Sequence, residues 1–193
     1  MKNIYYYCMA LGLIFSMQSQ AQETEQELLL AIEDNWRSER LSFPISFAPS
    51  LDYKGYEEVR FAKGWSKKDS DEFWTYAFVW YLDEDPELDA NQLNLDIAAY
   101  FDGLMSRISQ GKSKDFPSKV DMSWSEEEGE YKGVANIYDA FFTKGTIPLK
   151  VTIEEEDCPL LEKHTVLFRF TLKDWGDPIW DTLNAIQLNF ECQ

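Results

Sequence analysis

Apart from carboxylates, the side chains that most often perform chemistry in proteins are scarce in this chain. His164 is the single histidine, and the sequence contains no Gly-x-Ser-x-Gly, Gly-rich phosphate loop, Cys-x-x-Cys or His-Glu-x-x-His motif. A Ser-His-Asp or Cys-His mechanism would have to use His164, and no serine or cysteine is marked out as its partner. One histidine also leaves too few ligands for a histidine-rich zinc site. We therefore expect a structural or surface role for His164, and no metal or cofactor.

Carboxylates are abundant, with 35 aspartates and glutamates in 193 residues. Glycoside hydrolysis needs two carboxyl groups about 5–9 Å apart, one of them with a pKa raised by an apolar setting. Glu72 and Asp83 are candidates because they stand at the two ends of a strongly aromatic segment. With so many acids, a pair at that separation is expected by chance. No catalytic residue is therefore assigned, and an enzyme is not the favoured class.

Three acidic runs, at 83–85, 126–128 and 154–157, concentrate oxygen ligands. We expect the second and third runs in turns at one rim of a β-meander, where they could hold calcium or meet a basic partner. The alternative is a pair of solvated turns. It is favoured because Leu88 occupies the position of the required glycine when residues 83–94 are aligned with a calcium-binding loop.

The tryptophans offer a second functional signal. Trp65 lies in a polar loop beside Lys63, Lys67 and Lys68, the one basic cluster of the sequence, and Trp175 precedes a Gly-Asp-Pro turn. An exposed tryptophan next to cations can stack on a carbohydrate, bind an anion or contact another protein. We therefore predict Trp65, Lys63, Lys67 and Trp175 as ligand-binding residues. The alternative is that each ring packs back onto the core as a loop anchor, which is the commoner arrangement.

The aromatic segment 72–82 is the most unusual part of the chain. Both of its alternating faces are apolar, which is typical of a central strand covered on both sides. We expect one cover to be a long helix; the second would be an N-terminal helix, the curl of the sheet or another molecule. The premise to be tested is that residues 73–82 run extended through the middle of the molecule.

Capping patterns predict three helices. Thr24 begins a capping box for a short helix over residues 24–37, and Asp89 begins a long helix over residues 90–110. Pro178 stands where the first residue of a short C-terminal helix is expected. One long helix and two short ones among runs of strands favour an α+β arrangement.

Period-two alternation and turn residues predict the strands. The first expected strand lies near residues 41–47, where Pro44 and the following Pro49 favour an edge position. Short connections predict that the C-terminal strands form an antiparallel meander. The fold class is thus a single α+β domain over residues 22–193, with a curved antiparallel sheet of about seven or eight strands packed by the long helix. The remaining expected strands cover residues 57–62, 118–124, 130–138, 147–153, 164–172 and 186–190.

The N-terminus has the features of a cleaved export signal. Lys2 precedes an apolar stretch over residues 4–17, and Ser19 and Ala21 supply the small residues of a cleavage site before Gln22. The apolar stretch is shorter than a spanning helix requires, so we expect an exported protein without a membrane span. The alternative is an uncleaved anchor.

Cleavage at that site would remove Cys8 and leave Cys158 and Cys192. In an oxidising compartment two remaining thiols usually pair, and closing a loop of this length would stabilise the fold by about 3–4 kcal/mol. The prediction is a Cys158–Cys192 disulfide; the alternative is two buried free thiols.

Net charge narrows the range of functions. The formal charge of −17 repels phosphate backbones, which excludes nucleic acid as a partner. The favoured hypothesis is a non-catalytic exported domain, periplasmic or secreted, that binds a carbohydrate, another ligand or a protein through aromatic surface. The alternatives are a glycan hydrolase with a carboxylate pair and a structural subunit of the cell envelope.

Overall fold

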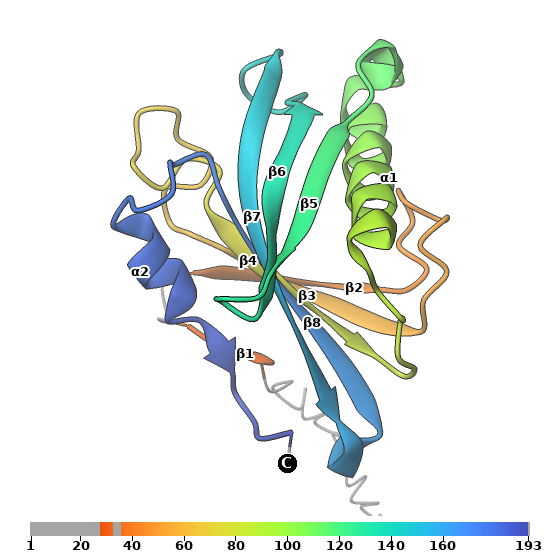
Figure 1. Cartoon of the computed structure of the whole chain (residues 1–193). Coiled ribbons are helices and arrows are strands. Elements are labelled where there is room, and N and C mark those ends of the chain that lie inside the picture. Colours follow the sequence, from red (N-terminus) through yellow and green to blue (C-terminus); the bar gives the residue numbers. More distant parts are fainter. Residues whose placement is uncertain (1–27, 33–35, 193) are drawn as a thin grey trace, which may run out of the picture.

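The computed structural model describes residues 28–32 and 36–192. Within these residues the main element is a seven-stranded antiparallel sheet, in which β4 and β8 join a three-stranded N-terminal part to a four-stranded meander. Figure 1 shows β2 running across the direction of β5–β7, as in a strongly twisted sheet. The α+β class and the antiparallel meander are thereby confirmed. The spatial order is β2 (Arg37–Ser42), β3 (Gly55–Phe61), β4 (Tyr76–Leu82), β8 (Lys163–Thr171), β7 (Thr146–Cys158), β6 (Glu130–Tyr138) and β5 (Lys119–Ser125).

The aromatic segment is a central strand, as predicted. β4 pairs with β3 on one side and β8 on the other, and all its residues except Tyr81 are buried. The strand is shorter than expected, because residues 73–75 form a turn and a short link before it. Trp74 has a φ of 57°, a left-handed conformation that does not fit an extended strand.

The long helix α1 (Ala90–Ser109) ends one residue before the predicted boundary. The Asp89 side chain caps it by accepting a hydrogen bond from the backbone N–H of Gln92 at 2.8 Å, and Gln110 ends it in a left-handed conformation. Its apolar stripe packs on the sheet, as period 3.6 requires. The buried apolar residues on this stripe are Leu93, Ile97, Tyr100, Phe101 and Met105.

Side chains of α1 also fasten the helix to the edge of the sheet. The Asn94 side chain accepts a hydrogen bond from the Met122 N–H of β5 at 2.9 Å. The Asp102 side chain accepts one from the Ser118 N–H at 2.8 Å, just before the same strand. These bonds satisfy donors that an edge strand would otherwise leave unpaired. In Figure 1, α1 accordingly lies alongside β5.

The predicted N-terminal helix over residues 24–37 is wrong where the structure describes it. Residues 24–27 and 33–35 lie outside the described part, but β1 (Leu30–Ala31) is a strand, paired with β9 (Gln187–Leu188), and Arg37 already begins β2. The backbone N–H groups of Leu29 and Leu30 bind the Glu58 carboxylate, so tertiary contacts override the helical spacing. β2 does occupy an edge position.

The second face of the sheet is covered by the chain itself. Its cover consists of β1, β9 and the short helix α2 (Ile179–Asn184), which lie together beside the sheet in Figure 1. Trp180 and Leu183 of α2 are buried in the same apolar cluster as Ala77 and Val79 of β4. From the sequence, an N-terminal helix, the curl of the sheet or another molecule was expected as the second cover. The observed cover is none of these. In the described part of the chain no helix is long and apolar enough to cross a membrane.

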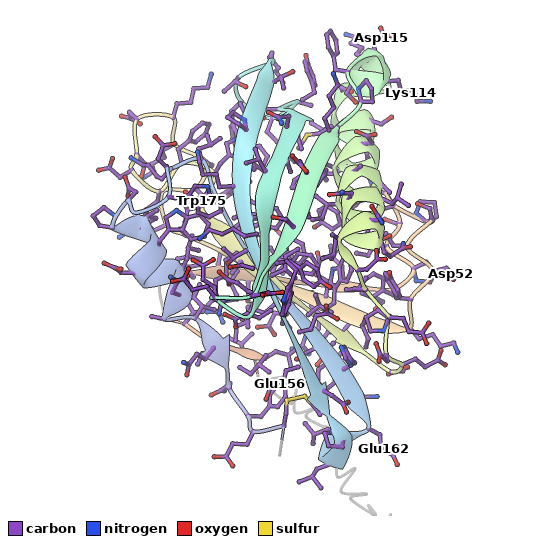
Figure 2. The ribbon with its side chains drawn as sticks, viewed as in Figure 1. Asp52, Lys114, Asp115, Glu156, Glu162 and Trp175 are labelled. Carbon is purple, nitrogen blue, oxygen red and sulfur yellow. A yellow bond between two sulfur atoms is a disulfide. The ribbon has the colours of Figure 1, made fainter. Side chains whose placement is uncertain are left out.

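The predicted disulfide between Cys158 and Cys192 is present and appears in Figure 2 beside Glu156. It fastens the C-terminal segment to the end of β7. The acidic run 154–157, however, is not in a turn. It continues β7 through Cys158, because cross-strand pairs stabilise this hairpin: Glu154 binds Arg169, and Glu155 lies 3.6 Å from His164.

Candidate functional site

An apolar cavity of about 340 Å³ opens between α1, the β2–β4 part of the sheet and the loops that follow β3 and β6. Aliphatic side chains contribute little of its wall, chiefly Leu41, Val59 and Leu104. Most of the wall is aromatic, and such walls bind apolar molecules in proteins. The aromatic residues that line it are Phe47, Phe61, Trp65, Trp74, Tyr76, Tyr100, Phe101, Phe141 and Phe142.

Close packing of α1 against residues 43–54 forms one side of the cavity. Gly103 permits this approach, because a Cβ atom there would clash with the carbonyl oxygen of Phe47. Tyr53, at the other end of the segment, donates a hydrogen bond of 2.6 Å to Asp96 of α1. Phe47 is thus held in edge-to-face contact with Tyr100, with 5.0 Å between ring centroids.

Asp139 organises the opposite side of the cavity. Its fully buried carboxylate accepts hydrogen bonds from the backbone N–H groups of Phe141 and Phe142 at 2.9 Å and of Thr143 at 2.7 Å. It also accepts one from Trp74 Nε1 at 3.3 Å. One carboxylate therefore positions three of the aromatic rings that line the cavity. Sequence reasoning missed Asp139, although an aspartate directly after a strand is typical of a turn.

Trp74 is held in an unusual backbone conformation at the cavity wall. A φ of 57° is rare for a bulky residue, and the strain is balanced by the Asp139 bond and by a 2.9 Å hydrogen bond from the Trp74 N–H to the Trp65 carbonyl. The rings of Trp65 and Trp74 meet edge to face at 6.2 Å. Backbone strain of this kind concentrates at functional sites.

Tyr76 lines the cavity, and its hydroxyl is a buried polar group next to the apolar wall. Its side chain is 4 % exposed, and its hydroxyl has no hydrogen-bond partner within the described residues. The ring is fixed by nearly parallel stacking on Phe170, with 5.0 Å between centroids. Burial, together with the nearby charge of Glu57, raises the pKa of Tyr76 well above its ordinary value, so the phenol keeps its proton.

Glu57 is a buried acid behind the cavity wall, and the sequence analysis did not single it out. Trp80 Nε1 donates a 2.8 Å hydrogen bond to one carboxylate oxygen, and the Tyr100 hydroxyl donates one of 2.9 Å to the other. Burial raises the pKa of Glu57 to about 7, and these two bonds offset part of that rise. The sequence feature that could have indicated Glu57 is the presence of an acid within a segment that is predicted to be a strand.

The cavity mouth is polar and solvated. Arg37 and Glu39 form an exposed ion pair of 2.6 Å there, and the Arg37 guanidinium lies 5.1 Å from the Phe61 ring centroid. Ser66, next to Trp65, also borders the opening. The site is thus an apolar chamber with a small polar rim and a buried acid behind its wall.

The structure separates the predicted ligand-binding residues. Trp65 is half-buried and lines the cavity, whereas Lys63 and Lys67 are exposed on the same loop and do not line it. Trp175 borders a different, shallow hollow over β5 and β6. No observation tests whether any of these four residues binds a ligand, so that assignment stays a prediction.

Trp175 is 39 % exposed and makes two contacts through its ring. Figure 2 shows it on the α2 side of the sheet, where it stacks on Trp180 with 4.7 Å between centroids. The Lys132 ammonium lies over the same ring, also at 4.7 Å. Contacts with both an indole and a cation favour an anchoring role for Trp175.

The candidate acids Glu72 and Asp83 do not converge. Glu72 accepts a 2.6 Å hydrogen bond from the Gly64 N–H, while Asp83 pairs with Lys163 at 2.7 Å. Ten residues separate them in sequence, and the seven that form β4 alone span roughly 20 Å at about 3.3 Å per residue. This distance is too long for a pair of carboxylates that hydrolyses a glycosidic bond.

The acidic run beside the disulfide lines a separate groove of about 670 Å³. Glu154 and Glu155 are partly committed there to Arg169 and His164. In the described part of the chain no group of three or more His, Cys, Asp and Glu side chains is arranged to hold a metal ion. We therefore favour the aromatic cavity over this groove as the candidate site.

Comparison with known proteins adds no function: no family model, no curated protein and no solved structure matches the chain. The functional argument consequently depends on the geometry of the site.

Proposed function

We propose that this protein is an exported, non-catalytic binding protein whose aromatic cavity takes up a small apolar molecule. The cavity itself is the observation that carries the proposal: about 340 Å³ of space, lined chiefly by rings and open at a polar mouth. This volume lies at the lower end of the range for small-molecule sites. Protein interiors are normally packed without such voids, so an aromatic chamber of this size needs an explanation.

The cavity walls are held in place by specific contacts. Gly103 and the Tyr53–Asp96 hydrogen bond fix one side, while Asp139 fixes Trp74 and the loop after β6 on the other. The strained backbone of Trp74 supports the same conclusion. A chamber whose walls are fixed in this way loses little entropy when a ligand binds, which favours affinity.

The proposal that the protein is exported has independent support. The signal-like features of residues 1–21 predict it, and the Cys158–Cys192 disulfide is compatible with an oxidising compartment. The absence of a catalytic role is supported by the position of Glu57. Both its carboxylate oxygens already accept hydrogen bonds, and Glu57 itself does not line the cavity.

Binding can be tested with N-phenyl-1-naphthylamine, a neutral probe whose fluorescence rises in an apolar site. We expect the wild-type protein to bind it at a single saturable site. Leu104→Trp places a larger side chain in the cavity. We expect this variant to bind the probe about tenfold more weakly or worse, because the indole fills space that the probe needs.

Leu95→Trp is the matched control, because it makes the same change on the same helix at a residue that is 66 % exposed and away from the cavity. This variant should bind the probe as the wild type does. If Leu95→Trp and Leu104→Trp bind equally well, or if the wild type does not bind at all, the aromatic cavity is not a ligand site.

A further inference from the structure

We propose that the cavity binds an amphipathic molecule end-on. Its apolar part, of about ten carbon atoms, fills the chamber, while its polar head stays at the mouth beside Arg37, Glu39 and Ser66. This inference rests on the proposed function, because it names the chemical class of the ligand and its orientation in the same cavity. It depends on the size of the chamber, the polar groups in its wall and those at its mouth.

The size of the chamber limits what it can enclose. Its volume is about 340 Å³. An engineered apolar cavity of about 150 Å³ binds benzene, so this chamber has room for roughly twice that apolar bulk. A naphthyl group or a chain of about ten carbon atoms is of this size, whereas a larger ligand would have to extend out of the mouth.

The buried polar side chains of the wall have no donor to offer a ligand. The Trp74 indole N–H is bound to Asp139, and the Tyr100 hydroxyl is bound to Glu57. The Tyr76 hydroxyl has almost no exposed surface, so a ligand cannot reach it. A ligand oxygen buried in the chamber would therefore lose its hydrogen bonds to water and gain none from these side chains, which opposes binding.

The mouth, by contrast, carries exposed polar side chains. Arg37, Glu39 and Ser66 all border the cavity and are exposed, so they remain in contact with water. The Arg37 guanidinium also lies 5.1 Å from the ring centroid of Phe61, which lines the cavity. A head group there can hydrogen-bond to these side chains or to water while the attached apolar part enters the chamber.

Two alcohols of the same composition test the orientation. 1-Decanol carries its hydroxyl at the end of the chain, whereas 5-decanol carries it near the middle. Their affinities are measured by displacement of N-phenyl-1-naphthylamine and corrected for each alcohol's partition into octanol, which removes any general difference in hydrophobicity. We expect 1-decanol to bind about tenfold more tightly, because 5-decanol must either bury its oxygen or leave about half of its chain in water.

Charged head groups test where the head lies. Decanoate and decylammonium are compared at neutral pH in about 0.1 M salt, and the ratio of their affinities is measured in each variant. We expect Glu39→Gln to shift this ratio toward decanoate by about threefold, and Arg37→Gln to shift it toward decylammonium by a similar factor.

Lys54→Gln and Glu84→Gln are the matched controls, because they make the same changes in another exposed ion pair that does not border the cavity. Lys54 precedes β3 and Phe61 ends it, so at about 3.3 Å per residue the two lie roughly 20 Å apart. Charges separated by more than about 10 Å are largely screened at this salt concentration. The control variants should therefore leave the ratio unchanged.

The outcomes distinguish this inference from the proposed function. If neither N-phenyl-1-naphthylamine nor any of the decyl compounds binds the wild type, the proposed function fails. If they bind but 1-decanol has no advantage over 5-decanol after the correction, the end-on orientation is overturned while the binding function stands. If the mouth variants change the ratio no more than the control variants do, the head group does not lie beside Arg37 and Glu39, and the inference is again overturned.

Discussion

The two faces of β4 are closed in different ways. Toward α1, the strand presents Tyr76, Phe78 and Trp80, which pack ring against ring with the neighbouring strand and the helix. Toward α2, it presents the smaller Ala77 and Val79 together with Tyr81, which pack against β1, β9 and α2. The first face has a large aromatic core with a cavity in it, whereas the second has a small core surrounded by buried charges.

Buried charges on the second face bind backbone groups. Glu58 accepts hydrogen bonds from the N–H groups of Leu29 and Leu30 at 2.9 and 3.2 Å and pairs with Arg40 at 2.9 Å. Arg169 donates to the Ile186 carbonyl at 2.8 Å. These contacts specify where the N-terminal and C-terminal segments lie on the sheet, which apolar packing alone would not do.

The buried acid on the helix-side face of the sheet is bound by side chains instead, and Asp139 binds backbone groups of its own loop and an indole N–H. Glu57 is bound by Trp80 and Tyr100, and Tyr76 is left over. The comparison indicates that charge-to-backbone contacts attach the terminal segments to one face of the sheet, while bulky rings on the other face leave a cavity. Substitutions on the two faces should therefore have different consequences, and the largest is expected on the α2 side.

Glu58→Ala is expected to have the largest effect on stability. It leaves Arg60, which is 3 % exposed and 3.9 Å from Glu58, without this carboxylate, and it frees two N–H groups of the N-terminal segment. Breaking a buried ion pair in this way costs about 3–5 kcal/mol. Urea denaturation followed by tryptophan fluorescence measures the change in free energy of unfolding.

Glu84→Ala serves as the control, because it removes an exposed carboxylate that pairs with Lys54 at the surface. We expect this variant to unfold at the wild-type urea concentration. If the two variants unfold together, Glu58 does not hold the N-terminal segment, and the proposed difference between the two faces is wrong.

Glu57→Gln sharpens the comparison through pH. Because the pKa of Glu57 is about 7 in the folded protein and 4.5 ordinarily, the folded state holds this proton more tightly than the unfolded chain. Its contribution to stability is complete below pH 4.5 and is lost as the pH rises through 7. The loss amounts to about 3 kcal/mol.

The glutamine of this variant can accept from Trp80 and donate to Tyr100 without titrating. The difference in unfolding free energy between variant and wild type should therefore shift in favour of the variant from pH 5 to pH 8. Glu126→Gln, at an exposed turn, should show no such shift. A parallel pH dependence for wild type and Glu57→Gln would mean that Glu57 stays ionised in the folded protein.

The sequence allowed the regular elements to be predicted where local pattern decides them. The Asp89 cap and a stripe with period 3.6 predicted α1 to within one residue, and the doubly apolar segment predicted β4 as central. The disulfide followed from there being two cysteines after the expected cleavage. Each of these inferences depends on residues close in sequence or on simple counting.

Elements decided by tertiary contacts could not be predicted in the same way. The spacing of Leu28, Ile32 and Trp36 indicates a helix, but Glu58, thirty residues away from Leu28, binds this segment as a strand. The acidic run in β7 looked like a turn because its cross-strand partners Arg169 and His164 belong to another strand. Pattern rules take no account of such partners.

Only part of the candidate site was accessible from sequence. Trp65 was singled out for its polar loop, yet the structure places it in the cavity wall among rings from four distant segments. Trp74 and Tyr76 belong to the aromatic segment that was predicted as a strand covered on both sides, and Glu57 was not singled out. The pairing of Glu57 with Trp80 comes from the register between β3 and β4, which hydrophobic alternation leaves undetermined.

The smallest effect is expected from Lys173→Ala, which removes a surface link near the cavity. Lys173 pairs with Asp71 at 2.8 Å, joining the loop that carries Trp65 to the segment after β8. The pair is exposed and screened by solvent, so we expect no measurable change in melting temperature or in affinity for N-phenyl-1-naphthylamine.

Lys68→Ala, which removes another exposed charge from the same loop, is the control. The reasoning is that Asp139 holds the aromatic wall from inside the protein. If Lys173→Ala weakened binding and Lys68→Ala did not, the surface link would be what positions Trp65, and the cavity would be less rigid than its internal hydrogen bonds imply.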